Sequence, residues 1–229
     1  MSSEQKTVII TGSEGLIGKS AAQFLAQWHH VVELDLALGH DLTNEAFVRR
    51  WFAENPGEFL VNLFALNDHV EAGVHSAETL FDTTLDSFRR YLEVNLTSLF
   101  SVCREFARNN EGGGIVNFSS TYGLVSPRPE MYGAGQKHVA YGVSKAGVVQ
   151  LTRHLAVHLA PRFRVNCVVP GGVRFRQSEE FQRRYAQHTP LRRMMEANEL
   201  HGILGYLCSD SSSYTSGAVI PVDGGWTAV

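Results

Sequence analysis

The chain has 229 residues, a length that suits one domain or two small ones. Hydrophobic residues make up 44% and charged residues 19%, which excludes wholesale disorder and fibrous repeats. The 20 Lys and Arg against 23 Asp and Glu give a net charge of −3, so no basic field is available and we expect no nucleic-acid partner. The ten histidines are scattered without ligand spacing, and we therefore assign no metal.

The first residues, MSSEQK, are polar, and no apolar run approaches the roughly 20 residues that span a bilayer. We therefore expect no signal peptide, no membrane contact and a soluble, cytoplasmic protein, with residues 1–6 as a flexible tail. The cysteines support this interpretation, because an odd number without CxxC spacing is typical of reduced, buried thiols. They are Cys103, Cys167 and Cys208.

Along the chain, apolar β-branched runs alternate with helical patterns, and no linker or repeat divides them. The runs predict strands at residues 7–11, 31–35, 59–66, 115–118, 164–169 and 218–222. Apolar spacing predicts helices at residues 19–28, 43–52, 85–108, 141–159 and 200–207. Strands separated by helices indicate an α/β fold with a doubly wound parallel sheet of the Rossmann type, as a single domain over residues 1–229.

The connection after the second strand is shortened. Only six steps separate Asp35 from Asp41, whereas a crossover between parallel strands needs about a dozen residues and usually a helix. We therefore expect no helix in this connection, and an edge strand that is vestigial or absent. The next helix should begin almost at once, at Thr43 or Asn44.

A glycine turn joins the first strand to the first helix. Its GxxGxxG spacing permits close approach of the backbone to a pyrophosphate, whose charge the N–H groups at the helix start receive. A plain turn with a packed glycine has the same spacing, but the position between a strand and a helix favours a dinucleotide site. The cofactor-binding residues expected here are Gly12, Glu14, Gly15, Leu16, Ile17 and Gly18.

Asp35 lies 17 residues after Gly18, at the end of the second strand. A carboxylate there can accept hydrogen bonds from the adenosine ribose hydroxyls and repel a 2′-phosphate. The alternative is a solvated carboxylate at a strand end. Because Glu14 adds a second negative charge and no Arg or Lys closely follows Asp35, NAD is favoured over NADP.

Tyr141 and Lys145 are four residues apart on a predicted helix and therefore share one face. A nearby cation stabilises a phenolate and lowers the pKa of a tyrosine from about 10 toward neutrality, which makes Tyr141 a candidate general acid or base. Such pairs are also common on solvated helix faces. Ser119 and Ser120 favour the catalytic interpretation, because they follow a predicted strand at the edge of the sheet that lines the ligand crevice.

Taken together, these motifs resemble the short-chain dehydrogenase/reductase family over nearly the whole chain. The matching pieces are TGSEGLIG at 11–18, Asp35, Asp41 and Leu42, Asn95 in VNL, IVNFSS at 115–120, Tyr141 with Lys145, Pro170 and Gly171, and VDGG at 222–225. Each piece is weak singly, but their order and positions are highly specific.

The resemblance implies a role for each catalytic position. Ser120 would orient the substrate oxygen, and Tyr141 would exchange its proton. Lys145 would bind the nicotinamide ribose and lower the pKa of Tyr141, while Asn95 would hold a water of the proton relay. The implied cofactor contacts also include Asp41 and Leu42 at the adenine, Pro170 and Gly171 at the nicotinamide, and Ala65 and Val173.

Several features depart from the family pattern. Leu16 stands where a glycine is usual, Asn62-Leu-Phe-Ala65 replaces Asn-Asn-Ala-Gly, and Phe175 replaces a threonine. Ser120 and Tyr141 are 21 residues apart, where about a dozen is typical of the family. We therefore expect an inserted loop at residues 125–140 that forms a wall of the substrate pocket. Tyr132 within it has no lysine four places on and is not expected to be catalytic.

Residues 173–197 correspond to the segment that closes over the substrate in this family, and we expect a substrate lid there. Its arginines can be interpreted either as an anion clamp or as a solvated helix face. They are Arg174, Arg176, Arg183 and Arg184.

The sequence thus predicts an NAD-dependent oxidoreductase that interconverts a secondary alcohol and a ketone on a small polar substrate. The loop and lid look most like family members that act on sugars in carbohydrate biosynthesis. The alternative is a non-catalytic dinucleotide-binding regulatory or scaffold protein, which the altered residues Leu63, Phe64 and Phe175 keep open. The apolar helix 141–159 and strand 218–222, with the family resemblance, predict a homotetramer, with a homodimer next.

Overall fold

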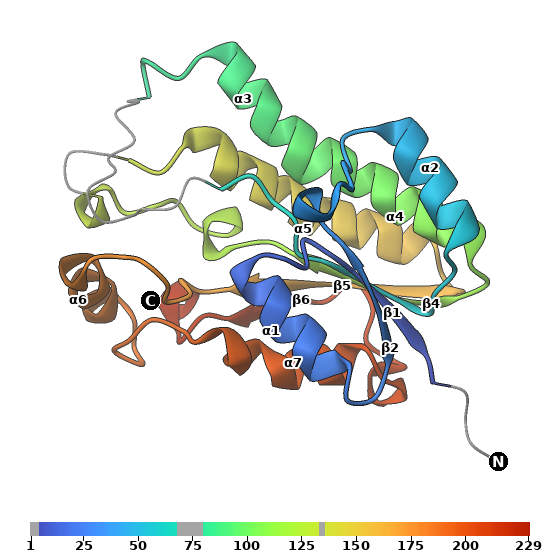
Figure 1. Ribbon diagram of the computed structural model, residues 1–229. Coiled ribbons are helices and arrows are strands. Elements are labelled where there is room, and N and C mark those ends of the chain that lie inside the picture. Colours follow the sequence, from blue (N-terminus) through green and yellow to red (C-terminus); the bar gives the residue numbers. More distant parts are fainter. Residues whose placement is uncertain (1–4, 68–79, 133–135) are drawn as a thin grey trace.

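Six parallel strands build the sheet in a computed structural model that describes residues 5–67, 80–132 and 136–229. Their order is β2-β1-β3-β4-β5-β6, which confirms the doubly wound parallel fold (Figure 1). The strands are β1 (Thr7–Thr11), β2 (His30–Leu34), β3 (Phe59–Asn62), β4 (Gly113–Phe118), β5 (Phe163–Pro170) and β6 (Val219–Val222).

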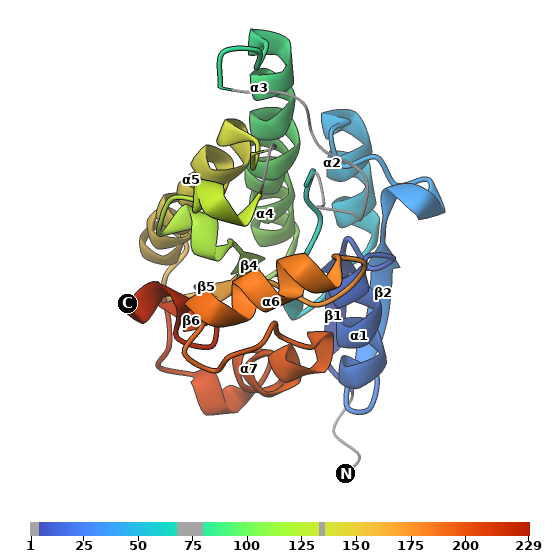
Figure 2. The same ribbon diagram turned by 90° about the vertical axis from the view of Figure 1, so that its left-hand side faces the viewer.

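Helices cover both faces of the sheet. One face carries α1 (Leu16–Leu25) and α7 (His201–Leu207), and the other carries α2 (Glu45–Glu54), α4 (Ser98–Asn109) and α5 (Val139–His158) (Figure 1). A π-helical turn at Glu93–Thr97 joins α3 (Leu85–Leu92) to α4. Figure 2 shows α6 (Glu179–His188) across one end of the sheet, between the two helical layers.

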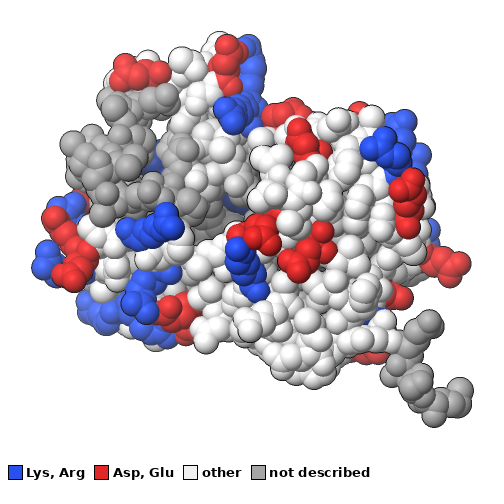
Figure 3. All heavy atoms as spheres, in the orientation of Figure 1, with Lys and Arg blue, Asp and Glu red and all other residues white. Residues whose placement is uncertain are grey.

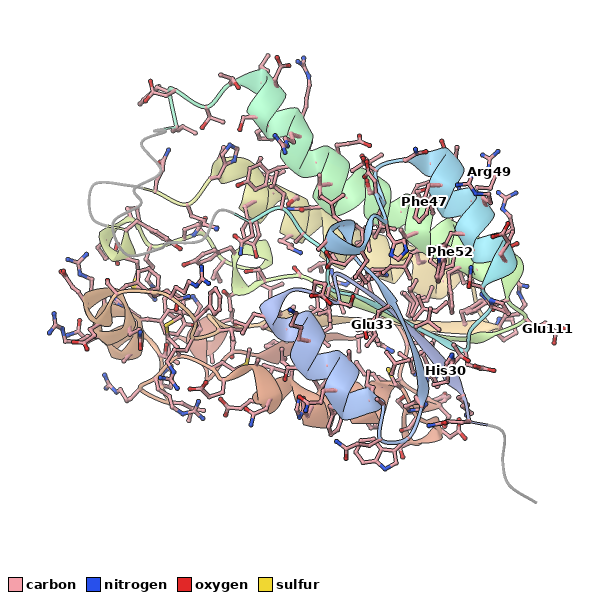
Figure 4. All side chains as sticks on the ribbon, viewed as in Figure 1. His30, Glu33, Phe47, Arg49, Phe52 and Glu111 are labelled. Atoms are coloured by element: carbon pink, nitrogen blue, oxygen red, sulfur yellow. The ribbon has the colours of Figure 1, made fainter. Side chains whose placement is uncertain are left out.

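Each face of the sheet has its own apolar core, because successive strand residues point to opposite faces. Ile9 of β1 packs with Phe52 of α2 and Phe106 of α4, whereas Val8 and Ile10 pack on the side of α1 and α7. Phe52 is fully buried, and Figure 4 shows it on α2. The three cysteines are buried and free, as expected.

The shortened connection after β2 is confirmed. Between Asp35 and Asp41 the chain makes one 3₁₀ turn, Leu36–Leu38, and no strand. Asn44 then caps α2 by accepting a hydrogen bond from the backbone N–H of Phe47. Because no further strand pairs with β2 among the described residues, β2 forms one edge of the sheet (Figure 4).

Two predicted boundaries are wrong and one helix was missed, each for a local reason. α1 begins at Leu16 rather than residue 19, because Gly15 serves as its N-cap. β3 ends at Asn62 rather than residue 66, because the backbone of Leu66 pairs with a side chain instead of a strand. α6 was not predicted as a helix because it buries only one of its residues, Tyr185, and so has no apolar stripe.

The described helices include none with the length and apolar character needed to cross a membrane. On the face shown in Figure 3, lysines and arginines alternate with acidic side chains rather than forming a field of one sign.

Candidate active site

A cavity of about 300 Å³ opens between the glycine turn, the end of β4, α5 and α6. It lies where parallel strands end, the edge at which α/β sheets bind ligands. The predicted site residues that line it are Gly12, Gly15, Leu16, Ile17, Gly18, Ala65, Ser120, Tyr141, Lys145, Pro170, Gly171 and Val173. Those outside its described lining are Glu14, Asp35, Asp41, Leu42 and Asn95.

The glycine turn fits a pyrophosphate. Gly12 has φ +73°, and a Cβ there would lie 2.6 Å from Cα of Phe64. A Cβ on Gly18 would overlap the carbonyl oxygen of Gly12 and lie 2.7 Å from that of Ser13. No side chain caps the N-terminus of α1, so its first N–H groups remain available to an anion.

Asp35 connects the glycine turn to the chain that follows β2 through hydrogen bonds. Its carboxylate accepts hydrogen bonds from the backbone N–H groups of Glu14 at 3.0 Å and Ala37 at 2.8 Å. The Glu14 carboxylate itself lies 2.8 Å from the Lys19 ammonium. The second negative charge expected from Glu14 is therefore offset by Lys19, and Asp35 alone carries the argument against a 2′-phosphate.

Asp41 and Leu42 are engaged in local structure. The carboxylate of Asp41 accepts hydrogen bonds from the hydroxyl and the backbone N–H of Thr43, at 2.7 and 2.9 Å, and these bonds lower the pKa of Asp41. The side chain of Leu42 packs in the core with α2. Because its side chain is in the core, Leu42 could contact a cofactor only through its backbone. The adenine contacts of Asp41 and Leu42 stay predictions.

Tyr141, Lys145 and Ser120 meet at the cavity. Burial raises the pKa of Tyr141, and the Ser120 side chain opposes the rise. The Lys145 ammonium donates to the carbonyl of Phe118 at 3.0 Å, 5.9 Å from the centroid of the Tyr141 ring. Burial lowers the pKa of Lys145 to about 8, so it keeps its proton at pH 7.

The two serines after β4 have different partners. The Ser119 hydroxyl donates to the backbone carbonyl of Lys145 at 2.7 Å, which attaches α5 to the end of the strand. The hydroxyl oxygen of Ser120 accepts the backbone N–H of Tyr122 at 3.2 Å. Because the Ser119 hydroxyl is engaged by α5, Ser120 is the member of the pair whose hydroxyl can face Tyr141 in the cavity.

Asn95 lies in the π-helical turn, a feature that frequently marks functional sites. Its side chain oxygen accepts the backbone N–H of Leu66 at 2.7 Å. Its amide nitrogen donates to the Leu66 carbonyl and to the Ser144 hydroxyl, both at 3.0 Å. Asn95 thus connects the chain after β3 to α5, and its water-holding role stays a prediction.

Beneath the cavity runs a buried polar chain that the sequence analysis missed. Thr11 donates to Asn62 at 3.0 Å, Asn62 donates to Asn117 at 2.9 Å, and Asn117 donates to Thr152 at 3.0 Å. It connects β1, β3, β4 and α5, and so fixes the spacing of the elements that carry the site. The signal was present, since Asn62 and Asn117 are polar residues inside apolar runs.

Aromatic and methionine side chains form the wall opposite the glycine turn. They are Tyr122, Tyr132, Phe175, Phe181, Tyr185 and Met194. The Tyr132 hydroxyl donates to that of Tyr122 at 2.6 Å, and the Tyr185 hydroxyl accepts the backbone N–H of Gly172 at 2.6 Å. Tyr132 belongs to the inserted loop, of which residues 133–135 lie outside the described part.

Residues 2–227 match the family described as "Enoyl-(Acyl carrier protein) reductase". The chain belongs to the short-chain dehydrogenase/reductase family. It is 33% identical to the 3-oxoacyl-[acyl-carrier-protein] reductase FabG of Aquifex aeolicus over 98% of this chain and 89% of that protein. It is 29% identical to meso-2,3-butanediol dehydrogenase of Serratia marcescens, over 98% and 96%.

A solved structure supports the same assignment. A short-chain dehydrogenase from Leptospira borgpetersenii with bound NAD⁺ superposes with a TM-score of 0.85 at 27% identity, over 98% of this chain and 93% of that one. The prediction of an oxidoreductase of the short-chain dehydrogenase/reductase family is therefore confirmed, in preference to the non-catalytic alternative.

In this short-chain dehydrogenase/reductase the arginines of residues 173–197 make other contacts, and a substrate lid there stays a prediction. Arg174 pairs with Glu196 at 2.6 Å, Arg184 pairs with Glu180, and Arg176 stacks on the Phe175 ring. Neither these three nor Arg183 is among the described residues that line the cavity. The contacts favour the solvated face over the anion clamp.

Proposed function

We propose that the protein is an NAD-dependent oxidoreductase that interconverts a secondary alcohol and a ketone on a small polar substrate. The observation that carries the proposal is that Ser120, Tyr141 and Lys145 line one cavity together with the glycine turn. A dinucleotide on the turn and a substrate at the tyrosine would therefore share this space.

The protein's own groups supply the proton chemistry. In alcohol oxidation, the Tyr141 phenolate accepts the hydroxyl proton while Ser120 holds the oxygen; in reduction, the phenol returns that proton. The Lys145 ammonium stabilises the phenolate electrostatically. When bound, the nicotinamide ring supplies the group that accepts or donates hydride.

The lining of the cavity supports a small polar substrate. The Tyr122 and Tyr132 hydroxyls add hydrogen-bonding groups to its lining. The relative named meso-2,3-butanediol dehydrogenase acts on such an alcohol. Within this class of substrate, we propose a sugar.

Absorbance of NADH should rise when the protein is mixed with NAD and a polyol, sugar or hydroxy acid. A parallel assay mixes the protein with a 3-oxoacyl thioester and NADPH, because one relative is a 3-oxoacyl carrier-protein reductase. Loss of NADPH absorbance measures turnover in this assay. Turnover of a hydroxylated small molecule supports the proposal. Turnover confined to the thioester would contradict it.

Asp35 should make NAD the preferred cofactor. We expect NADH to bind more tightly than NADPH, because the carboxylate repels a 2′-phosphate. Asp35→Asn removes the charge and should narrow the ratio of the two dissociation constants by roughly tenfold. Fluorescence titration of each nucleotide measures this ratio, and tighter NADPH binding by the wild type would reverse our assignment.

Exposed apolar side chains support a homotetramer. On α5, Val157 is 75% exposed and Val143 47% exposed, and Phe100 of α4 is 43% exposed. Such residues are more often covered in an assembly than left in water. Light scattering should give the mass of four chains, or of two; the mass of one chain would refute the assembly.

A further inference from the structure

A second lysine lies over the proposed acid/base. The Lys137 ammonium is 4.5 Å from the centroid of the Tyr141 ring, closer than the 5.9 Å of Lys145. Lys137 is half-buried, lines the cavity, and donates a hydrogen bond to the side chain oxygen of Asn67. The inserted loop and the chain after β3 therefore hold this ammonium above the ring together.

Several other groups of the described residues pack around Tyr141. From the end of β4 come the Ser120 hydroxyl and the Tyr122 phenol. Tyr91 of α3 also packs against Tyr141, and the titratable His138 stacks on Tyr91 at 4.2 Å. The Tyr132 phenol interacts with Tyr141 electrostatically. Within the described residues, the cations placed at the ring are Lys137 and Lys145.

These two cations differ in their surroundings. Lys145 is buried and bonded to a carbonyl, and its burial lowers its pKa to about 8. Its positive charge thus declines at alkaline pH, where a tyrosine ionises. Lys137 is only half-buried, so desolvation opposes its charge less.

We propose that Lys137 is a second cation that stabilises the phenolate of Tyr141. It acts through Tyr141 as a positioning residue, and this inference rests on the proposed function of that tyrosine. An opposite charge within about 4–6 Å favours the ionised form of a group by roughly 1–3 pH units. Because Lys137 is half-buried, solvent screens its charge. We therefore expect Lys137 to lower the pKa of Tyr141 by about one unit, the lower end of this range.

Nuclear magnetic resonance of protein labelled with ¹³C at the tyrosine Cζ tests this without substrate or cofactor. The Tyr141 signal is the one missing from Tyr141→Phe, and its chemical shift against pH gives the ionisation midpoint. Lys137→Gln should raise that midpoint by about one pH unit. Lys137→Arg, which keeps the charge, should leave it near the wild-type value.

The matched control is Lys6→Gln. Lys6 pairs with Asp210 at 2.7 Å, just before β1 and at the opposite end of the sheet, so its loss should not move the Tyr141 midpoint. Circular dichroism follows the fold through each titration. Lys137→Met, which keeps the aliphatic chain, replaces the Gln variant if that variant unfolds.

An unchanged midpoint in the folded, uncharged variant would overturn the inference. So would a wild-type Tyr141 that does not ionise before the protein unfolds, because two cations should bring its ionisation within that range. Either result leaves the proposed function standing if Tyr141→Phe abolishes turnover. If Tyr141→Phe keeps its turnover, the proposed function fails whatever the midpoint.

Discussion

Tyr141→Phe is expected to lower turnover by roughly 10²- to 10⁴-fold, the loss typical of a missing general acid/base. The substitution keeps the buried ring and removes only the phenolic hydroxyl. Binding of NADH should persist, because the glycine turn is untouched. Initial rates and a fluorescence titration on the same preparation separate the two effects.

Tyr214→Phe is the matched control, because Tyr214 is fully exposed and its hydroxyl lies outside the described lining of the cavity. It should retain wild-type turnover and stability. Near-normal turnover in Tyr141→Phe would remove Tyr141 from the mechanism.

Gly18→Ala should disrupt both cofactor binding and stability. The added Cβ would overlap the carbonyl oxygen of Gly12 and lie 2.7 Å from that of Ser13. Both atoms belong to the backbone, so the turn itself must shift, at a cost of about 1–3 kcal/mol in the free energy of unfolding. A displaced turn should also weaken NADH binding by at least roughly tenfold, or about 1.4 kcal/mol.

Gly202→Ala provides a control of opposite sign. Gly202 lies in α7, and a Cβ there would meet nothing within 4 Å. Alanine should raise the free energy of unfolding by about 0.5–1 kcal/mol, because it favours the helix. Urea unfolding measures both variants, and a Gly18→Ala protein with wild-type stability and NADH affinity would contradict the packing argument.

Local signals predicted the fold well. Alternating apolar runs and helical patterns gave the sheet and its main helices, and the six steps after Asp35 gave the shortened connection. Each of these depends on residues close together in the sequence. α6 was not predicted because its one buried residue, Tyr185, packs with distant residues such as Tyr132 and Trp226 rather than within an apolar stripe of the helix.

For the candidate site, motifs predicted the groups but not their neighbours. The family pattern located Ser120, Tyr141 and Lys145, yet nothing in it indicated that Lys19 pairs with Glu14. Lys137 was missed for the same reason. The distance from its ammonium to the Tyr141 ring depends on how the inserted loop folds back, which no spacing in the sequence encodes.

The π-helical turn at Glu93–Thr97 rotates one half of a long helix against the other (Figure 1). One extra residue in a helical turn changes the direction of every later side chain by about 100°. This lets α4 face the sheet and α2 while α3 turns toward α5, where Tyr91 meets His138. Deleting one residue of this turn would make α3 and α4 one regular α-helix and rotate their side chains relative to each other. Asn95 would then lose its hydrogen bonds with Leu66. The number of residues in this turn therefore matters as well as their identity.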